Sequence, residues 1–178
     1  MSAGSSPEEP RAPRATGLPH PTREGAEVTL ERTVPARADR LHGRSRDRIR
    51  ALDVLFEADA KQVDVLDVLA ERLRVTAAQT PLPQLARELV ELYAPYALDI
   101  DEDLETHSRD WPLHRMPAVD RAILRLGSAE VLYGESDTSR GAVIGEYTKI
   151  AEVLSTDDSP RFVNGLLQRL AEVRGLLS

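Results

Sequence analysis

The stretch Ser155-Thr-Asp-Asp-Ser-Pro-Arg-Phe-Val-Asn-Gly165 contains the start signals of a helix. Side-chain oxygens of Asp158 or Ser159 can accept hydrogen bonds from the free amides of a first helical turn. Pro160 suits the first helical positions, because no amide hydrogen is needed there. The stretch therefore predicts a helix that begins near residue 159.

Apolar residues continue this helix at helical spacing, which places one stripe against a core. They are Val163, Leu166, Leu167, Leu170 and Val173. Phe162 lies about 100° from Val163 around the helix, at the edge of the stripe. In a chain with few aromatic residues, Phe162 thus stands beside Arg161 and Asn164, outside the centre of the predicted core.

The same spacing predicts further helices at about 45–61, 63–74, 85–108, 117–133 and 139–154. Pro95 should kink or split the third of these, and Gly134 should end the fourth. The inward positions expected in the segments 45–61, 63–74 and 139–154 are Ile49, Leu52, Leu55, Phe56, Val65, Leu66, Leu69, Leu73, Val143, Tyr147, Ile150 and Leu154. No alternating run with turn signals occurs, so the prediction is an all-α compact bundle of six to seven helices.

Composition bounds the rest of the chain. Residues 1–43 hold six of the twelve prolines and no sustained apolar period, which predicts a disordered tail before a helical domain at 44–178. Cysteine is absent, so disulfides and cysteine-ligated metals are excluded. Because no signal segment or run of about 18 apolar residues is found, we expect a soluble cytoplasmic protein.

Charge is distributed unevenly. Residues 1–43 are neutral overall, residues 44–50 carry four Arg and one Asp, and the remainder carries 13 basic and 23 acidic groups, which gives −7 in total. A local basic patch on an acidic body can still bind phosphate, because local fields decide such binding.

Four arginines form this patch: Arg44, Arg46, Arg48 and Arg50. On a helix, Arg44 and Arg48 share one face, and Arg46 and Arg50 share another about 200° away. The planar guanidinium fork suits phosphate, so the run predicts RNA binding. The alternative is a solvated helix start with local salt bridges from Asp47.

Phe162 also has two interpretations. It can be peripheral core, or it can stack a base of single-stranded RNA, with Arg161 and Asn164 as polar partners. Catalytic signals are scarce, because no phosphate loop, nucleophile elbow or histidine pair at metal-ligand spacing occurs. We therefore expect no enzymatic activity, no metal and no cofactor.

Four blocks of sequence resemble the NusB family of transcription antitermination factors. They are residues 44–59 (RSRDRIRALDVLFEAD), 116–126 (MPAVDRAILRL), 146–152 (EYTKIAE) and 155–167 (STDDSPRFVNGLL). The resemblance implies two small helical subdomains. It also implies binding to the boxA element of rRNA leader transcripts together with the ribosomal protein NusE, within an RNA polymerase antitermination complex that supports rRNA synthesis.

The resemblance also implies roles for individual residues. RNA binding falls to Arg44, Arg46, Arg48, Arg50, Arg161, Phe162 and Asn164, and NusE binding to Phe56, Asp120 and Asp158. The chain departs from the family pattern at Ser139, where proline is usual, and at Gly145. The alternatives are a helical module that binds only protein, an accessory domain of an rRNA methyltransferase, which would need a cysteine nucleophile, and a homodimer formed through exposed apolar surface.

Overall fold

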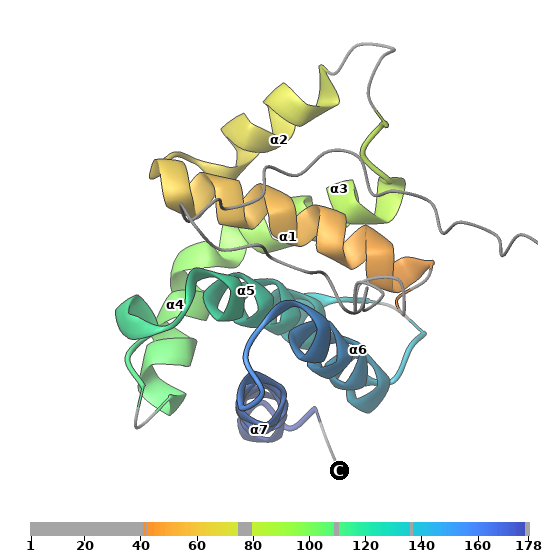
Figure 1. The fold of residues 1–178 in the computed structure, drawn as a ribbon. Coiled ribbons are helices and arrows are strands. Elements are labelled where there is room, and N and C mark those ends of the chain that lie inside the picture. The colour runs from red at the N-terminus through yellow and green to blue at the C-terminus, as the bar shows by residue number, and fades with distance from the viewer. Residues whose placement is uncertain (1–40, 42, 75–79, 109–110, 136, 177–178) are drawn as a thin grey trace, which may run out of the picture. The chain divides into compact units, whose positions relative to one another are not determined.

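The computed structural model describes residues 41, 43–74, 80–108, 111–135 and 137–176. Within these ranges every regular element is helical, which confirms the all-α prediction (Figure 1). The elements are α1 (Arg44–Lys61), α2 (Val65–Leu73), α3 (Gln84–Tyr93), the 3-10 turn η2 (Ala94–Tyr96), α4 (Ala97–His107), the 3-10 turn η3 (Leu113–Arg115), α5 (Ala118–Tyr133), α6 (Arg140–Leu154) and α7 (Ser159–Val173). The predicted tail lies outside the described residues except at positions 41 and 43.

The helices pack in two groups that share α5. Helices α1, α2 and α3 contact one another, and α4, α6 and α7 gather on α5, which also contacts α1 and α3. Figure 1 shows α5 between α1 and α7. Ten consecutive-turn positions of α5 are buried, including Ile123, Leu124 and Leu126. A helix buried nearly all round belongs at the centre of a bundle.

Helix boundaries follow the predicted signals. The chain passes from α3 through η2 to α4 around Pro95, because proline cannot donate the backbone hydrogen bond of a continuous helix. Gly134 ends α5, and its amide donates to the carbonyl of Glu130 at 3.1 Å. A Cβ at Gly134 would lie 2.4 Å from that carbonyl oxygen, so the close approach requires glycine.

Four apolar side chains predicted to face the core are exposed instead. Phe56, Leu66, Leu73 and Leu154 are 42%, 45%, 45% and 37% exposed. Helix α1 uses Leu52, Leu55 and Ala58 against the core, and the short α2 uses only Val68 and Leu69. One helix has a single buried stripe, so apolar residues beyond its width remain at the surface.

Helix α7 begins at Ser159 as predicted, but the predicted cap is wrong. Neither Asp158 nor Ser159 caps it with a side-chain hydrogen bond. The Ser159 hydroxyl is buried and donates to Asp120 Oδ2 at 2.8 Å. By contrast Ser139, where the family pattern has proline, caps α6 by accepting a hydrogen bond from the amide of Ala142 at 3.3 Å.

Candidate nucleic-acid interface

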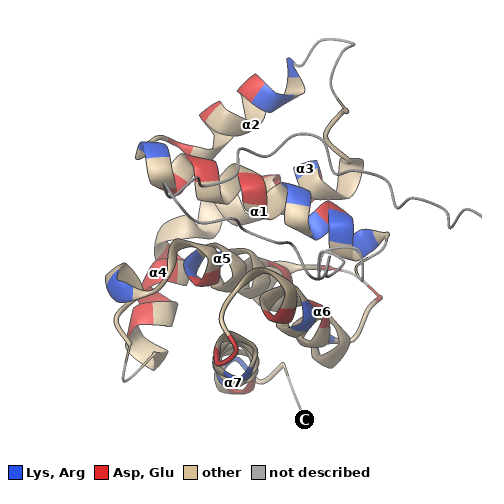
Figure 2. Ribbon diagram, in the orientation of Figure 1, with Lys and Arg blue, Asp and Glu red and all other residues tan. Residues whose placement is uncertain are grey.

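Two arginines project from the first turn of α1. Arg44 and Arg46 are exposed, and neither forms an ion pair within the described part of the chain. Arg46 Nε donates to the carbonyl of Leu41 at 2.9 Å, which orients its guanidinium. Arg50 is half-buried one turn further on. Figure 2 shows basic residues gathered at the start of α1 and acidic residues along the rest of the helix.

Arg48 does not belong to this exposed set, which contradicts its predicted role in RNA binding. Its side chain is 3% exposed and forms an ion pair with Glu130 of α5. Burial opposes the guanidinium charge, but the hydrogen bond from Glu130 outweighs it and raises the pKa of Arg48. The guanidinium is therefore committed to the interior and cannot reach a phosphate.

Glu130 connects three helices. It accepts a hydrogen bond from the Tyr147 hydroxyl of α6 at 2.7 Å, and burial together with Glu130 raises the pKa of Tyr147 well above its usual value. Ser45 donates to Glu146 of α6 close by. These contacts fix the start of α1 on α5 and α6, so Arg44 and Arg46 project from a rigid base.

The second predicted station lies at the start of α7. Phe162 is half-buried, and its ring centroid lies 5.2 Å from that of Trp111, with the rings tilted by 56°. Arg161 beside it is exposed. The Asn164 amide donates to Thr148 Oγ1 at 3.1 Å, so its nitrogen serves the packing of α7 on α6. Sequence reasoning missed Trp111 as a site residue, although it is the one tryptophan of the chain.

The arginine station and the Phe162 station do not meet. Arg48 reaches α5 at Glu130, whereas Ser159 reaches α5 at Asp120. Ten residues of helix separate these anchor points by about 15 Å along α5. A bound RNA would therefore need several nucleotides to reach from one station to the other, at about 3.4 Å per nucleotide in a stacked strand.

The three residues predicted to bind NusE are also not brought together. Phe56 is exposed on α1, whereas Asp158 is exposed and lines a hollow with Phe162. Asp120 is 0% exposed, which contradicts a direct contact with a partner. A buried carboxylate needs hydrogen-bond donors, and Ser159 supplies one.

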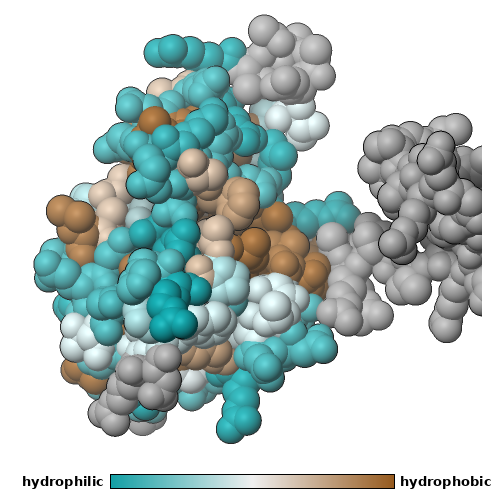
Figure 3. Space-filling view, turned by 60° about the vertical axis from the view of Figure 1, so that its left-hand side comes forward, coloured by the Kyte–Doolittle hydropathy of each residue, from teal (hydrophilic) through white to brown (hydrophobic). Residues whose placement is uncertain are grey.

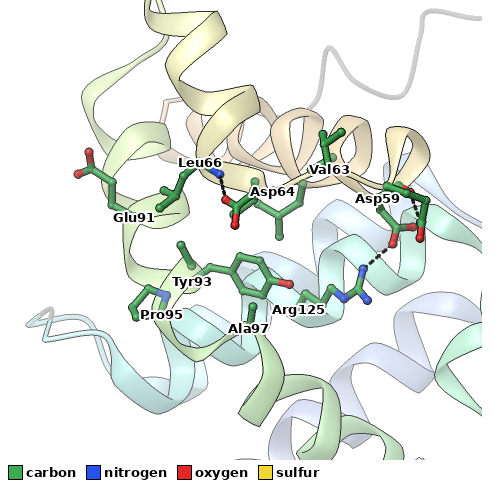
Figure 4. A pocket seen from close by; sticks show the side chains of 14 residues that line it. Asp59, Val63, Asp64, Leu66, Glu91, Tyr93, Pro95, Ala97 and Arg125 are labelled. Atoms are coloured by element: carbon green, nitrogen blue, oxygen red, sulfur yellow. Dashed lines mark hydrogen bonds and ion pairs between the residues drawn. The ribbon is translucent and has the colours of Figure 1, made fainter.

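An apolar groove of about 670 Å³ lies between the end of α1, α2 and the junction of α3 with α4. Figure 4 shows the Tyr93 ring in this groove, with Val63 and Leu66 above it and Arg125 beside it. Burial raises the pKa of Tyr93 to about 12. In Figure 3 apolar surface occurs in separate patches among hydrophilic residues.

One wall of this groove is an ion-pair network. Asp59 of α1 pairs with Arg121 and Arg125 of α5, at 2.6 and 2.8 Å, and Arg125 also pairs with Asp101 of α4 at 2.7 Å. Burial works against the Asp59 charge, but the two arginines outweigh it and lower the pKa of Asp59. The network joins α1, α4 and α5 at the end of α5 away from Arg48.

No group of side chains suited to hold a metal ion occurs among the described residues. Among the helices of the described ranges, none has both the length and the apolar character to cross a membrane.

The fold and its stations define a helical protein with separate basic and aromatic surfaces suited to RNA. The NusB family model matches residues 45–172, so the chain belongs to the NusB family. Transcription antitermination protein NusB of Kineococcus radiotolerans is 48% identical over 135 residues, which cover 76% of this chain and 97% of the relative. The protein of the same name from Beutenbergia cavernae is 44% identical, with 75% and 92% covered.

Solved structures share the fold. T. maritima NusB superposes with a TM-score of 0.62 at 28% identity, with 74% of this chain and 92% of that chain covered. A chain in the crystal structure of antitermination factors NusB and NusE in complex with dsRNA superposes with a TM-score of 0.58 at 24% identity, with 73% and 96% covered.

Proposed function

We propose that this protein is an RNA-binding transcription antitermination factor that binds boxA RNA of rRNA leader transcripts together with ribosomal protein NusE. The observation that carries the proposal is the exposed pair Arg44 and Arg46, held on a rigid helix start without a carboxylate partner in the described chain. The names of the relatives and the NusB–NusE–dsRNA structure support it.

The mechanism is recognition without chemistry. Arg44 and Arg46 neutralise phosphates, and the Phe162 station receives unstacked bases further along the strand. The about 15 Å between the stations favours an extended single strand over a compact hairpin loop. Because bound phosphates release counterions, affinity should fall as salt rises.

The protein-partner surface is proposed to centre on Phe56. This ring is 42% exposed on α1, on the opposite side from the core stripe. Large exposed aromatic side chains are frequent anchors of protein interfaces. Through NusE the complex would join RNA polymerase in the cytoplasm and support rRNA synthesis, and a homodimer would compete for the same apolar surface.

The test is a fluorescence anisotropy titration of labelled boxA RNA with the full chain, with NusE, and with both. We expect the pair to bind more tightly than either protein alone and more tightly than a scrambled RNA of equal length. Phe56→Ala should remove the gain from NusE and leave the RNA affinity of the chain alone unchanged. Equal binding of boxA and scrambled RNA by the pair would contradict the proposal. Retention of NusE without any RNA would favour a module that binds only protein.

A further inference from the structure

A hollow of about 690 Å³ lies between the end of α4, the segment leading to η3 and the first turns of α7. Its size falls within the range of small-molecule sites. We infer that this hollow holds one nucleotide of the bound RNA, with the base against Trp111 and Phe162 and the phosphates at Arg161 and Arg169. The inference rests on the proposed function and adds a defined base pocket to it.

Two aromatic rings form the apolar side of the hollow. Trp111 and Phe162 are both half-buried and tilted by 56°, so the two ring planes make a wedge and not a closed stack. A base can lie on one ring and meet the edge of the other, an arrangement that aromatic groups favour. Stacking of this kind tolerates any base, because every base has a π-face.

Polar atoms at the closed end are ready to contact a base edge. Ser108 is 5% exposed and lines the hollow, yet its hydroxyl has no hydrogen-bond partner within the described chain. Buried hydroxyls almost always have a partner, so this one calls for a group that enters from outside. Because a hydroxyl can donate or accept, Ser108 can meet either kind of atom on a base edge.

His107 beside it has a fixed tautomer. Its Nδ1 lies 2.8 Å from the carbonyl oxygen of Asp103, and since a carbonyl only accepts, Nδ1 carries the hydrogen. In the neutral ring Nε2 is therefore an acceptor. The closed end thus offers a hydroxyl and an imidazole acceptor, which suit a base that carries an amino group.

The open side is shaped by a glycine between two arginines. Arg161, Gly165 and Arg169 are four residues apart on α7 and all line the hollow, so they share one face. A Cβ at Gly165 would meet no atom within 4 Å, so packing inside the chain does not require glycine there. Its missing side chain leaves the floor open between two guanidinium groups that have no ion pair within the described chain.

Asp158 also lines the hollow and repels phosphate. It lies at the start of α7, close to Arg161, whereas Arg169 is two turns away. The bound phosphates should therefore lie toward Arg169.

The one tryptophan of the chain makes the hollow observable. Full-length protein is titrated with boxA RNA in the presence of NusE, and Trp111 fluorescence is recorded beside the anisotropy of the labelled RNA. We expect Trp111 to be quenched with the same midpoint as RNA binding. RNA binding without a change in Trp111 overturns the base pocket and leaves the proposed function intact, whereas no RNA binding overturns both. Quenching by NusE alone would assign the hollow to protein and overturn the inference.

Gly165→Gln fills the floor and keeps the fluorescent reporter. We expect it to weaken RNA binding by about 5-fold to 150-fold, the range for loss of one stacked base, and to abolish the quenching. Gly145→Gln is the matched control, because Gly145 is also a helical glycine without an atom within 4 Å of its Cβ position and lies on α6, away from this hollow. Equal RNA affinity of the two variants would overturn the inference. Ser108→Ala, a change of one buried atom, should lower affinity without unfolding the chain.

Discussion

Arg48 of α1 and Glu130 of α5 form a buried ion pair, with Nε 2.9 Å from Oε2 and side chains 3% and 5% exposed. Tyr147 donates to the same carboxylate. The basic run at the start of α1 thus contains one arginine that fixes the helix and two exposed arginines that the fixed helix presents. Position around the helix, and not residue type, divides these two tasks.

Arg48→Ala should lower the free energy of unfolding by about 3–5 kcal/mol, because Glu130 would remain buried without its cation. Urea unfolding followed by circular dichroism measures the loss. Arg44→Ala is the control, and as an exposed substitution it should stay within about 0.5 kcal/mol of wild type. Equal losses in the two variants would contradict the division of the run.

The double variant Arg44→Ala/Arg46→Ala should bind boxA RNA less tightly and with a weaker salt dependence. Loss of two phosphate contacts reduces the slope of log affinity against log salt by about 1.4 for a single strand. Arg87→Ala, which removes an exposed arginine paired with Glu91 on α3, should leave the slope unchanged. A wild-type slope in the double variant would argue against phosphate capture by α1.

Asp120→Ala should loosen the start of α7. It removes the acceptor of the buried Ser159 hydroxyl, and an unsatisfied buried group costs about 1–3 kcal/mol. Hydrogen exchange should rise at residues 159–163, and urea unfolding should show the lost stability. The exposed Asp158→Ala serves as control and should change neither. If Asp120→Ala lost NusE binding with unchanged stability and exchange, a docking role would be favoured over this positioning role.

Asp59 should make stability depend on acid pH. Its pKa is lowered from 3.8 in the folded state, so the unfolded chain binds its proton first as pH falls. The contribution of Asp59 is therefore complete above about pH 5 and is lost as pH falls below 3.8 toward the folded pKa. Relative to wild type, Asp59→Asn should cost about 1.5–3 kcal/mol at pH 7, the range for charged hydrogen bonds, and clearly less near pH 3. A pH-independent difference would contradict this assignment.

Two helical glycines should respond oppositely to alanine. At Gly127 a Cβ would lie 3.0 Å from Leu167 Cδ1 and 3.2 Å from Tyr147 Cγ, and the Tyr147 ring is held by Glu130. Gly127→Ala should therefore destabilise by about 1–3 kcal/mol through overpacking. Gly145→Ala, with open space, should stabilise by up to about 1 kcal/mol through helix propensity. Thermal unfolding of both variants tests the opposed signs, and a shift of both in one direction would contradict the packing argument.

Some of the site was predictable because it depends on local chemistry. The starts of α1 and α7, the break at Pro95 and the stop at Gly134 all follow from residues within one turn of each boundary. Exposure of Arg161 and the edge position of Phe162 follow from the period of α7. Trp111 was missed because its relation to Phe162 depends on how α4 packs against α7, which no local pattern contains.

The sequence by itself determined that the chain is helical, where most helices begin and end, and that positive charge collects at residues 44–50. Tertiary structure alone decided that Arg48 turns inward to Glu130 and Asp120 to Ser159, that Phe56 stays outside, and that the two stations stand apart along α5. The physical reason is that spacing along a helix fixes which side chains share a face. Only the packing of other helices decides which face is buried and which partner lies opposite.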